Sequence, residues 1–263
     1  MPSNRKLRAT AAAVGQPLLA IVGLFVIWEI AVRVFAVPGY VLPAPSAIWS
    51  SFMKMGGSTL SGHIGATLVT IVLGFLLSVV VSIPLAIAIT ASPTVSRVLY
   101  PLLILTQSIP KVALAPILII VLGANELPRV LVAFLVAFFP LVVSTSAGLL
   151  AAPPELIELA RSYRASKFKE LLRIRLPYAI PFIFSGLKVA SALSVVGTVV
   201  AEFVSANRGL GYLITTSMAF FETPVAWGAV VILAFMGMAF FGLIALLEKV
   251  LFPWADTSLV IGE

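Results

Sequence analysis

The chain has 263 residues, of which 61% are hydrophobic and 10% are charged. Soluble domains carry about 25% charged residues, so this composition excludes a soluble globular protein and indicates an integral membrane protein. The net charge of +7 comes from basic residues that cluster between apolar runs, a pattern that reflects membrane topology and not nucleic-acid binding. Cysteine is absent, which excludes disulfides and thiolate metal sites, and the single histidine, His63, cannot build a metal site by itself.

Six apolar runs are each long enough to cross a bilayer, which takes about 20 residues. They cover residues 17–37, 64–90, 98–122, 129–150, 178–204 and 225–247. We therefore expect an all-α polytopic membrane protein with six transmembrane helices. Residues 1–16 are expected to form an N-terminal tail, 17–252 the transmembrane domain with a loop at 151–177, and 253–263 a C-terminal tail.

Six spans place both termini on one side of the membrane, and the basic residues indicate which side. The segments on the side of the termini hold eleven basic residues: Arg5, Lys6, Arg8, Arg97, Arg161, Arg164, Lys167, Lys169, Arg173, Arg175 and Lys249. The segments on the other side hold three: Lys54, Arg129 and Arg208. Because positively charged loops stay in the cytoplasm, both tails and the 151–177 loop are predicted to be cytoplasmic.

Small and helix-breaking residues recur within the apolar runs. The second and fifth runs carry Gly, Ala, Ser or Thr at every fourth position, from Ala66 to Thr90 and from Gly186 to Thr198. Such side chains let membrane helices approach closely, which favours helix packing over a role in lining a pathway. The third run is interrupted by three prolines: Pro101, Pro110 and Pro116. Interrupted membrane helices mark either a translocation pathway or simple kinks.

Few charges lie within the runs. Glu29 and Arg33 are four residues apart and are predicted to pair on one helix face. Lys111 and Lys188 are possible pathway residues, because intramembrane charge usually faces protein or water, and a structural partner is the alternative for Lys188. Glu202, near the outer end of the fifth run, is interpreted as hydrated. Downstream of it, Gly209 and Gly211 predict a tight turn.

The loop between the fourth and fifth runs is the one long polar passage. Pro153 and Pro154 can open a helix, apolar residues follow at helical spacing, and Pro177 is predicted to end the pattern. The result is a short amphipathic helical segment between two apolar runs. One interpretation is a solvated loop that only fixes topology, and the other is a docking element for a partner.

Residues within this loop support the second interpretation. Glu158-Leu159-Ala160, followed by Ile174, Leu176 and Pro177, resembles the EAA loop (E-A-A, G, I-x-L-P) of permease subunits in binding-protein-dependent ABC importers. Leu159 replaces the middle alanine, and Arg164 stands where the family has glycine. Segments 41–49, 108–120 and 207–214 are similar to the nitrate/sulfonate/taurine-type branch, so the resemblance covers nearly the whole chain from Trp28 onward.

The resemblance implies a cytoplasmic coupling helix that docks on an ATPase. The residues implied in ATPase coupling are Glu158, Leu159, Ala160, Arg161, Arg164, Ala165, Ser166, Ile174, Leu176 and Pro177. Because Arg164 lacks the freedom of glycine, we expect the loop helix to run straighter than in the family. The implied partners are two ATP-binding subunits, a second permease copy that completes a homodimer, and an extracytoplasmic solute-binding protein, all at the cytoplasmic (inner) membrane.

No enzymatic activity or cofactor is expected for the chain itself. The phosphate-binding pattern G-x-x-x-x-G-K-[ST] does not occur in the sequence, so ATP hydrolysis is expected from a partner. The resemblance implies a small nutrient as substrate, either a nitrate-, sulfonate- or taurine-like anion or a heteroaromatic such as a thiamine precursor or riboflavin. The alternative function is a stand-alone secondary transporter or channel, although Glu29 is the one acid well inside a predicted span.

Overall fold

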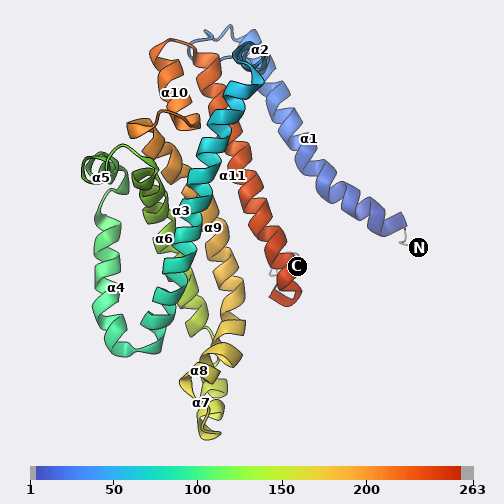
Figure 1. The fold of residues 1–263 in the computed structure, drawn as a ribbon. Helices are drawn as coiled ribbons and strands as arrows, with labels where there is room; N and C mark the ends of the chain where they lie inside the picture. The colour runs from blue at the N-terminus through green and yellow to red at the C-terminus, as the bar shows by residue number, and fades with distance from the viewer. Residues whose placement is uncertain (1–3, 256–263) are drawn as a thin grey trace. The chain divides into compact units, whose positions relative to one another are not determined.

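The computed structural model describes residues 4–255, and all regular secondary structure within that range is helical (Figure 1). The α-helices are α1 (Asn4–Val34), α2 (Pro45–Met55), α3 (Gly57–Ala91), α4 (Pro93–Ser108), α5 (Leu114–Leu122), α6 (Glu126–Leu150), α7 (Pro154–Ser162), α8 (Lys167–Glu170), α9 (Leu176–Ser205), α10 (Leu210–Ala219) and α11 (Thr223–Leu251). Short 3₁₀ turns lie at Lys111–Ala113 and Pro253–Ala255, and a π-helical turn lies at Leu171–Arg175. The all-α prediction is confirmed.

Four helices within the described residues are long and apolar enough to cross a membrane: α3, α6, the continuous stretch Lys167–Val204 that contains α9, and α11. The third predicted span is a broken pair, Thr94–Ser108 and Lys111–Leu122, which meet at 74°. The first predicted span lies in α1 and stays a prediction. Since α1 begins at Asn4, that helix also includes most of the predicted N-terminal tail. Of the predicted C-terminal tail, residues 256–263 lie outside the described residues.

The break in the third span occurs at one of its three prolines. Ile109 ends α4 in an extended conformation, with φ −79° and ψ 124°, as is typical of a residue that precedes proline. Pro110 follows it and begins the 3₁₀ turn. Pro101 lies inside α4, and Pro116 lies in the first turn of α5, where a missing N–H breaks no helical bond. Only Pro110 therefore interrupts the helix.

The chain divides into two compact units, and the larger one comprises residues 62–212 and 232–263. In this unit α6 and α9 run side by side, with α7 and α8 beyond one end of the pair (Figure 1). Glycines allow the close approach: a methyl group at Gly148 would lie 2.6 Å from Cβ of Phe182, and one at Gly186 would lie 2.8 Å from Cβ of Ser144. The predicted use of small residues for packing is confirmed, since Ala190, Ser194 and Thr198 are also buried.

The smaller unit comprises residues 1–61 and 213–231. In it, Arg33 pairs with Glu29 across one helical turn, with Nη2 2.5 Å from Oε1, as the sequence predicts. The second Glu29 oxygen accepts the backbone N–H of Ser46 at 3.0 Å and so fixes the start of α2. Trp28 and Trp227 make an edge-on contact with ring centroids 6.0 Å apart. Glu29 is thus a structural residue that links α1 to α2.

Candidate functional site

Helix α7 presents its polar and apolar side chains to solvent. It begins at Pro154, whose missing N–H leaves no helical bond unmade in the first turn. Leu159 is 54% exposed and Tyr163 is 81% exposed, so the apolar stripe of this helix is not buried against the described chain. Glu158 is also exposed and has no hydrogen bond or ion pair within the described residues. This helix face is therefore open to a partner.

The end of α7 keeps the bend that the family glycine provides. Arg164 adopts φ 52°, in the left-handed region, directly after the helix. Its N–H donates to the carbonyl of Arg161 at 2.9 Å, and the N–H of Ala165 donates to the carbonyl of Ala160 at 2.9 Å. This pair of bonds is a Schellman motif, in which glycine is usual at the left-handed position. The expectation of a straighter loop helix is wrong, because arginine accepts the left-handed conformation at a cost of about 1 kcal/mol.

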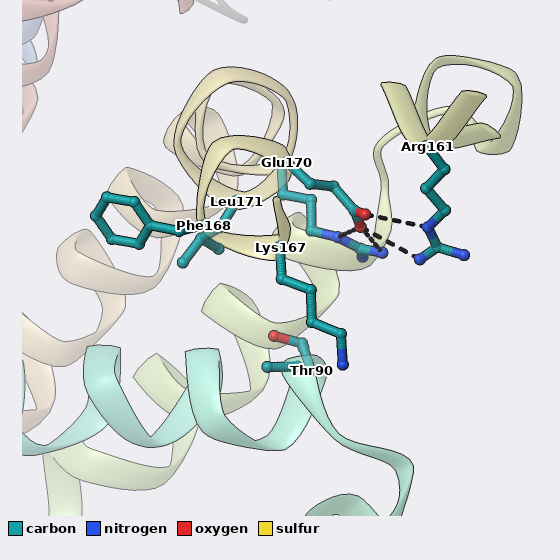
Figure 2. Close-up of a pocket in the computed structure, with 8 residues that line it drawn as sticks. Thr90, Arg161, Lys167, Phe168, Glu170 and Leu171 are labelled. Atoms are coloured by element: carbon teal, nitrogen blue, oxygen red, sulfur yellow. Dashed lines mark hydrogen bonds and ion pairs between the residues drawn. The ribbon is translucent and has the colours of Figure 1, made fainter. Parts of the chain in front are cut away.

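After the bend, α8 carries a buried carboxylate that holds two arginines. Ser166 caps α8 by accepting the N–H of Lys169 at 3.4 Å. The Glu170 side chain is 8% exposed and binds Arg161 Nε at 3.2 Å and Arg175 Nη2 at 2.8 Å. Figure 2 shows Arg161 of α7 reaching back to Glu170 across the turn. Since Arg175 Nη1 also donates to the carbonyl of Leu149 at 3.1 Å, Glu170 connects α7, α8 and the end of α6.

Pro177 does not end the helical pattern, contrary to the prediction. The helix continues from Lys167 to Val204 through a π-helical turn at Leu171–Arg175, where the N–H of Leu176 donates to the carbonyl of Leu171. Proline cannot donate, so a helix that contains it must lose one bond, and a wider turn just before it accommodates that loss. Pro177 thus lies in the first turn of α9.

The two halves of the EAA-like segment have different surroundings. Leu176, with Leu171, packs against a buried cluster that includes Ala86, Leu149 and Ala179, and Ile174 is half-buried. Glu158 and Leu159 are exposed. The second half therefore anchors the loop to the helix bundle, while the first half stays free for contact.

Each lysine predicted for the pathway has a neighbour. Lys111, at the break of the third span, donates to Gln107 Oε1 at 2.7 Å and lies 6.0 Å from the ring centroid of Phe139. Lys188 lies 2.5 Å from Oε2 of Glu248 in α11. This ion pair is the structural partner considered for Lys188, and Glu248 is a buried acid that the predicted span at 225–247 misses. Whether either lysine faces a pathway stays a prediction.

A buried carboxylate at the far end of α9 was not foreseen. Glu202 is 1% exposed, so the interpretation of a hydrated side chain is wrong. It accepts the N–H of Gly211 at 2.7 Å and the hydroxyl of Thr67 at 2.9 Å. Thr67 in turn accepts the N–H of Leu210, and His63 Nδ1 accepts that of Gly209 at 3.1 Å. The first N–H groups of α10, which have no partner inside the helix, are therefore satisfied by side chains of α3 and α9.

Comparison with known proteins identifies the family of this chain. The sequence pattern of the family described as "binding-protein-dependent transport system inner membrane component" matches residues 79–256. The chain belongs to this family. It is an ABC transporter permease with several apolar membrane helices, and it fits the nitrate/sulfonate/taurine branch.

Relatives of this permease are named for chemically diverse substrates. It is 36% identical to the formylaminopyrimidine transport permease protein ThiX of Halalkalibacterium halodurans, over 91% of this chain and 95% of that protein. It is 33% identical to the riboflavin transport system permease protein RibX of Chloroflexus aurantiacus, over 92% and 90%. It is 30% identical to the taurine transport system permease protein TauC of Escherichia coli, over 88% and 86%.

A solved structure shares the fold of this permease. A chain of the MetNI methionine ABC transporter, in inward-facing conformations, superposes with a TM-score of 0.60 at 16% identity. The match covers 72% of this chain and 96% of that chain. At this identity the likeness supports the fold alone.

Proposed function

We propose that this permease is the membrane-spanning subunit of an ATP-driven importer that passes a small nutrient from a solute-binding protein into the cytoplasm. The observation that carries the proposal is α7, which exposes Glu158, Leu159 and Tyr163. A single turn connects it to the long apolar helix that runs from Lys167 to Val204. An ATPase docked on that face would act on α9 through Glu170 and the continuous helix. The chain itself would hydrolyse no ATP, and two ATPase subunits and a second permease copy would complete the assembly.

Coupling is tested by reversing the charge of Glu158. Glu158→Lys should leave the permease folded, because the side chain is exposed and unpaired among the described residues. We expect about tenfold weaker association with the ATPase subunit, since a reversed charge in a contact acts against binding. Glu222→Lys, which reverses an exposed acid outside the loop, is the matched control. ATPase-driven uptake and ATPase binding are both measured, and unchanged values for Glu158→Lys would reject the docking role of α7.

The orientation proposed for the loop places residues 151–177 and both termini in the cytoplasm. Because the chain has no cysteine, single cysteines at Ser166 and Asn207 can be labelled without background. Both positions are exposed. The two cysteines should react with a membrane-impermeant reagent from opposite sides of the membrane, and labelling from one side would contradict this orientation.

For the substrate, we propose a small anionic or heteroaromatic nutrient, because the relatives are named for formylaminopyrimidine, riboflavin and taurine. Lys111, at the helix break, is our candidate for contact with it. The test is uptake by the reconstituted complex of taurine, an alkylsulfonate, nitrate, a pyrimidine precursor and riboflavin, with Lys111→Met in parallel. A preference for a cationic substrate, or anion uptake unaffected by Lys111→Met, would exclude a pathway role for this charge.

A further inference from the structure

A cavity of about 500 Å³ opens between the end of α3 and the α8 segment (Figure 2). Its wall is formed by Thr90, Ala91, Arg161, Lys167, Phe168, Glu170, Leu171 and Arg175. Cavities of this volume are typical of sites for small molecules or chemical groups. Thr90 and Ala91 are the last turn of α3, and Arg175 immediately precedes α9. The cavity therefore lies where two apolar membrane helices end.

The cavity wall is positively charged. It contains three cations and one carboxylate, so two positive charges are in excess. Glu170 is already shared by Arg161 and Arg175. Lys167 extends toward Thr90 in Figure 2 and has no ion pair or hydrogen bond within the described residues. A partly enclosed cavity with uncompensated positive charge favours binding of an anion.

The arginines are held in place before any ligand binds. Glu170 binds Nε of both guanidinium groups, at 3.2 Å for Arg161 and 2.9 Å for Arg175, and Leu149 accepts a bond from Arg175. A guanidinium has five N–H donors, and these contacts leave several of them available. Arginine donors match the oxygens of a phosphate group, and a fixed orientation reduces the entropy lost on binding.

Apolar side chains beside the cavity distinguish a lipid from a free anion. Phe168 is 68% exposed and points away from Arg161 in Figure 2, and Leu172 is 45% exposed four residues later. Aromatic residues at the ends of membrane helices commonly lie at the headgroup level. A soluble anion gains nothing from this apolar surface, whereas the acyl chains of a lipid would cover it.

We propose that this cavity binds the phosphate group of an anionic phospholipid from the leaflet that faces the loop, with acyl chains against Phe168 and Leu172. Basic pockets at the cytoplasmic ends of membrane helices bind such headgroups. The proposal rests on the cytoplasmic orientation proposed above for the loop. Bound lipid would sit beside Arg161 and so adjoin the end of α7.

The test is a binding titration of the purified full-length permease in a neutral detergent, followed by thermal unfolding. The probes are dioctanoyl phosphatidylglycerol, dioctanoyl phosphatidylcholine and inorganic phosphate. Phosphatidylglycerol should stabilise the protein, and Lys167→Met should weaken its binding about fivefold, the effect of one basic residue near a lipid phosphate. The neighbouring Lys169 is exposed and does not line the cavity, so Lys169→Met is the matched control and should not change the affinity.

Three outcomes would overturn the proposal. Equal effects of Lys167→Met and Lys169→Met would indicate general attraction to a basic surface. Equal binding of phosphatidylcholine would remove the need for an anion. Equal stabilisation by inorganic phosphate would identify a soluble-anion site instead. Because lipid binding is measured without the ATPase, its failure is distinguishable from a failure of the coupling that Glu158→Lys tests.

Discussion

Glu170 and Glu202 are buried carboxylates near the two ends of one continuous helix, yet they are stabilised in different ways. Glu170 is neutralised by two guanidinium groups, one of which, Arg161, is 64% exposed. Glu202 binds no basic side chain at hydrogen-bond distance among the described residues, and it accepts a backbone N–H and a hydroxyl instead. Glu170 thus lies in an open environment with charged hydrogen-bond donors, whereas Glu202 lies in a closed one, where its hydrogen bonds come from uncharged groups and the charge of Arg129 acts on it without a hydrogen bond. The open environment suits a contact that can move, such as that of Glu170 with Arg161 of α7. The closed environment suits a fixed structure, the start of α10 that Glu202 holds.

The largest expected effect is at Glu202. Glu202→Ala would remove the acceptor of the Gly211 N–H and the acceptor of the Thr67 hydroxyl. We expect a loss of about 3 kcal/mol in the free energy of unfolding, the combined effect of two buried polar groups. Glu202→Gln keeps an acceptor oxygen and should lose about 1 kcal/mol. Unfolding in detergent is the measurement, with the exposed Glu222→Ala as control. Equal losses for Ala and Gln would disprove the capping role.

The effect at Glu170 should be smaller and partly reversible by a second change. Glu170→Gln leaves Arg175, which is 17% exposed, without its counterion, while Arg161 can turn to water. Breaking a buried ion pair costs about 3–5 kcal/mol, but the adjoining cavity admits water, so we expect a loss of about 2 kcal/mol in the free energy of unfolding. The double variant Glu170→Gln/Arg175→Gln should regain most of this lost stability. If the two single losses simply add in the double variant, the carboxylate and Arg175 do not act as a pair.

The smallest effect concerns the two turns beside these carboxylates, one at Arg164 before Glu170 and one at Gly209 after Glu202. Arg164 at φ 52° and Gly209 at φ 129° both have positive φ, but only the first value is open to ordinary residues. Arg164→Gly should stabilise the permease by about 0.5 kcal/mol, because relief of the left-handed strain exceeds the entropy cost of glycine. Arg164→Val should destabilise it by about 1 kcal/mol. Thermal unfolding of the two variants and of the wild type shows whether each substitution stabilises or destabilises the permease. If Arg164→Gly were destabilising, Arg164 would contribute contacts of its own.

Local patterns in the sequence were sufficient to predict much of the fold. The apolar runs predict most of the membrane helices, and the four-residue spacing of Glu29 and Arg33 predicts their pairing, because partners within one helical turn are visible in the sequence. The clustered charges and the EAA-like residues also lie close together in the sequence, and they indicate the loop between the fourth and fifth runs. The sequence does not single out Pro110 as the position of the break, since the third run contains three prolines.

Features that depend on distant contacts could not be predicted. Glu202 lies 135 positions from Thr67, and its other partner is a backbone N–H, which no residue type reveals. Glu248 lies one residue beyond the sixth predicted run and 60 positions from Lys188, so the sequence pattern does not reveal that the two side chains pair. The left-handed Arg164 contradicts the usual preference for glycine, and the hydrogen bonds around it determine its conformation.

The helix from Lys167 to Val204, which stays continuous through its π-helical turn, has a mechanical consequence. Glu170 and Glu202 are 32 positions apart, which corresponds to about 48 Å at 1.5 Å per residue. A stiff rod of that length converts a rotation of about 5° at one end into a displacement of about 4 Å at the other. Because Glu202 holds the start of α10, a small tilt imposed at the charged end would reposition the α10 turn on the opposite side of the bilayer without any local rearrangement between them.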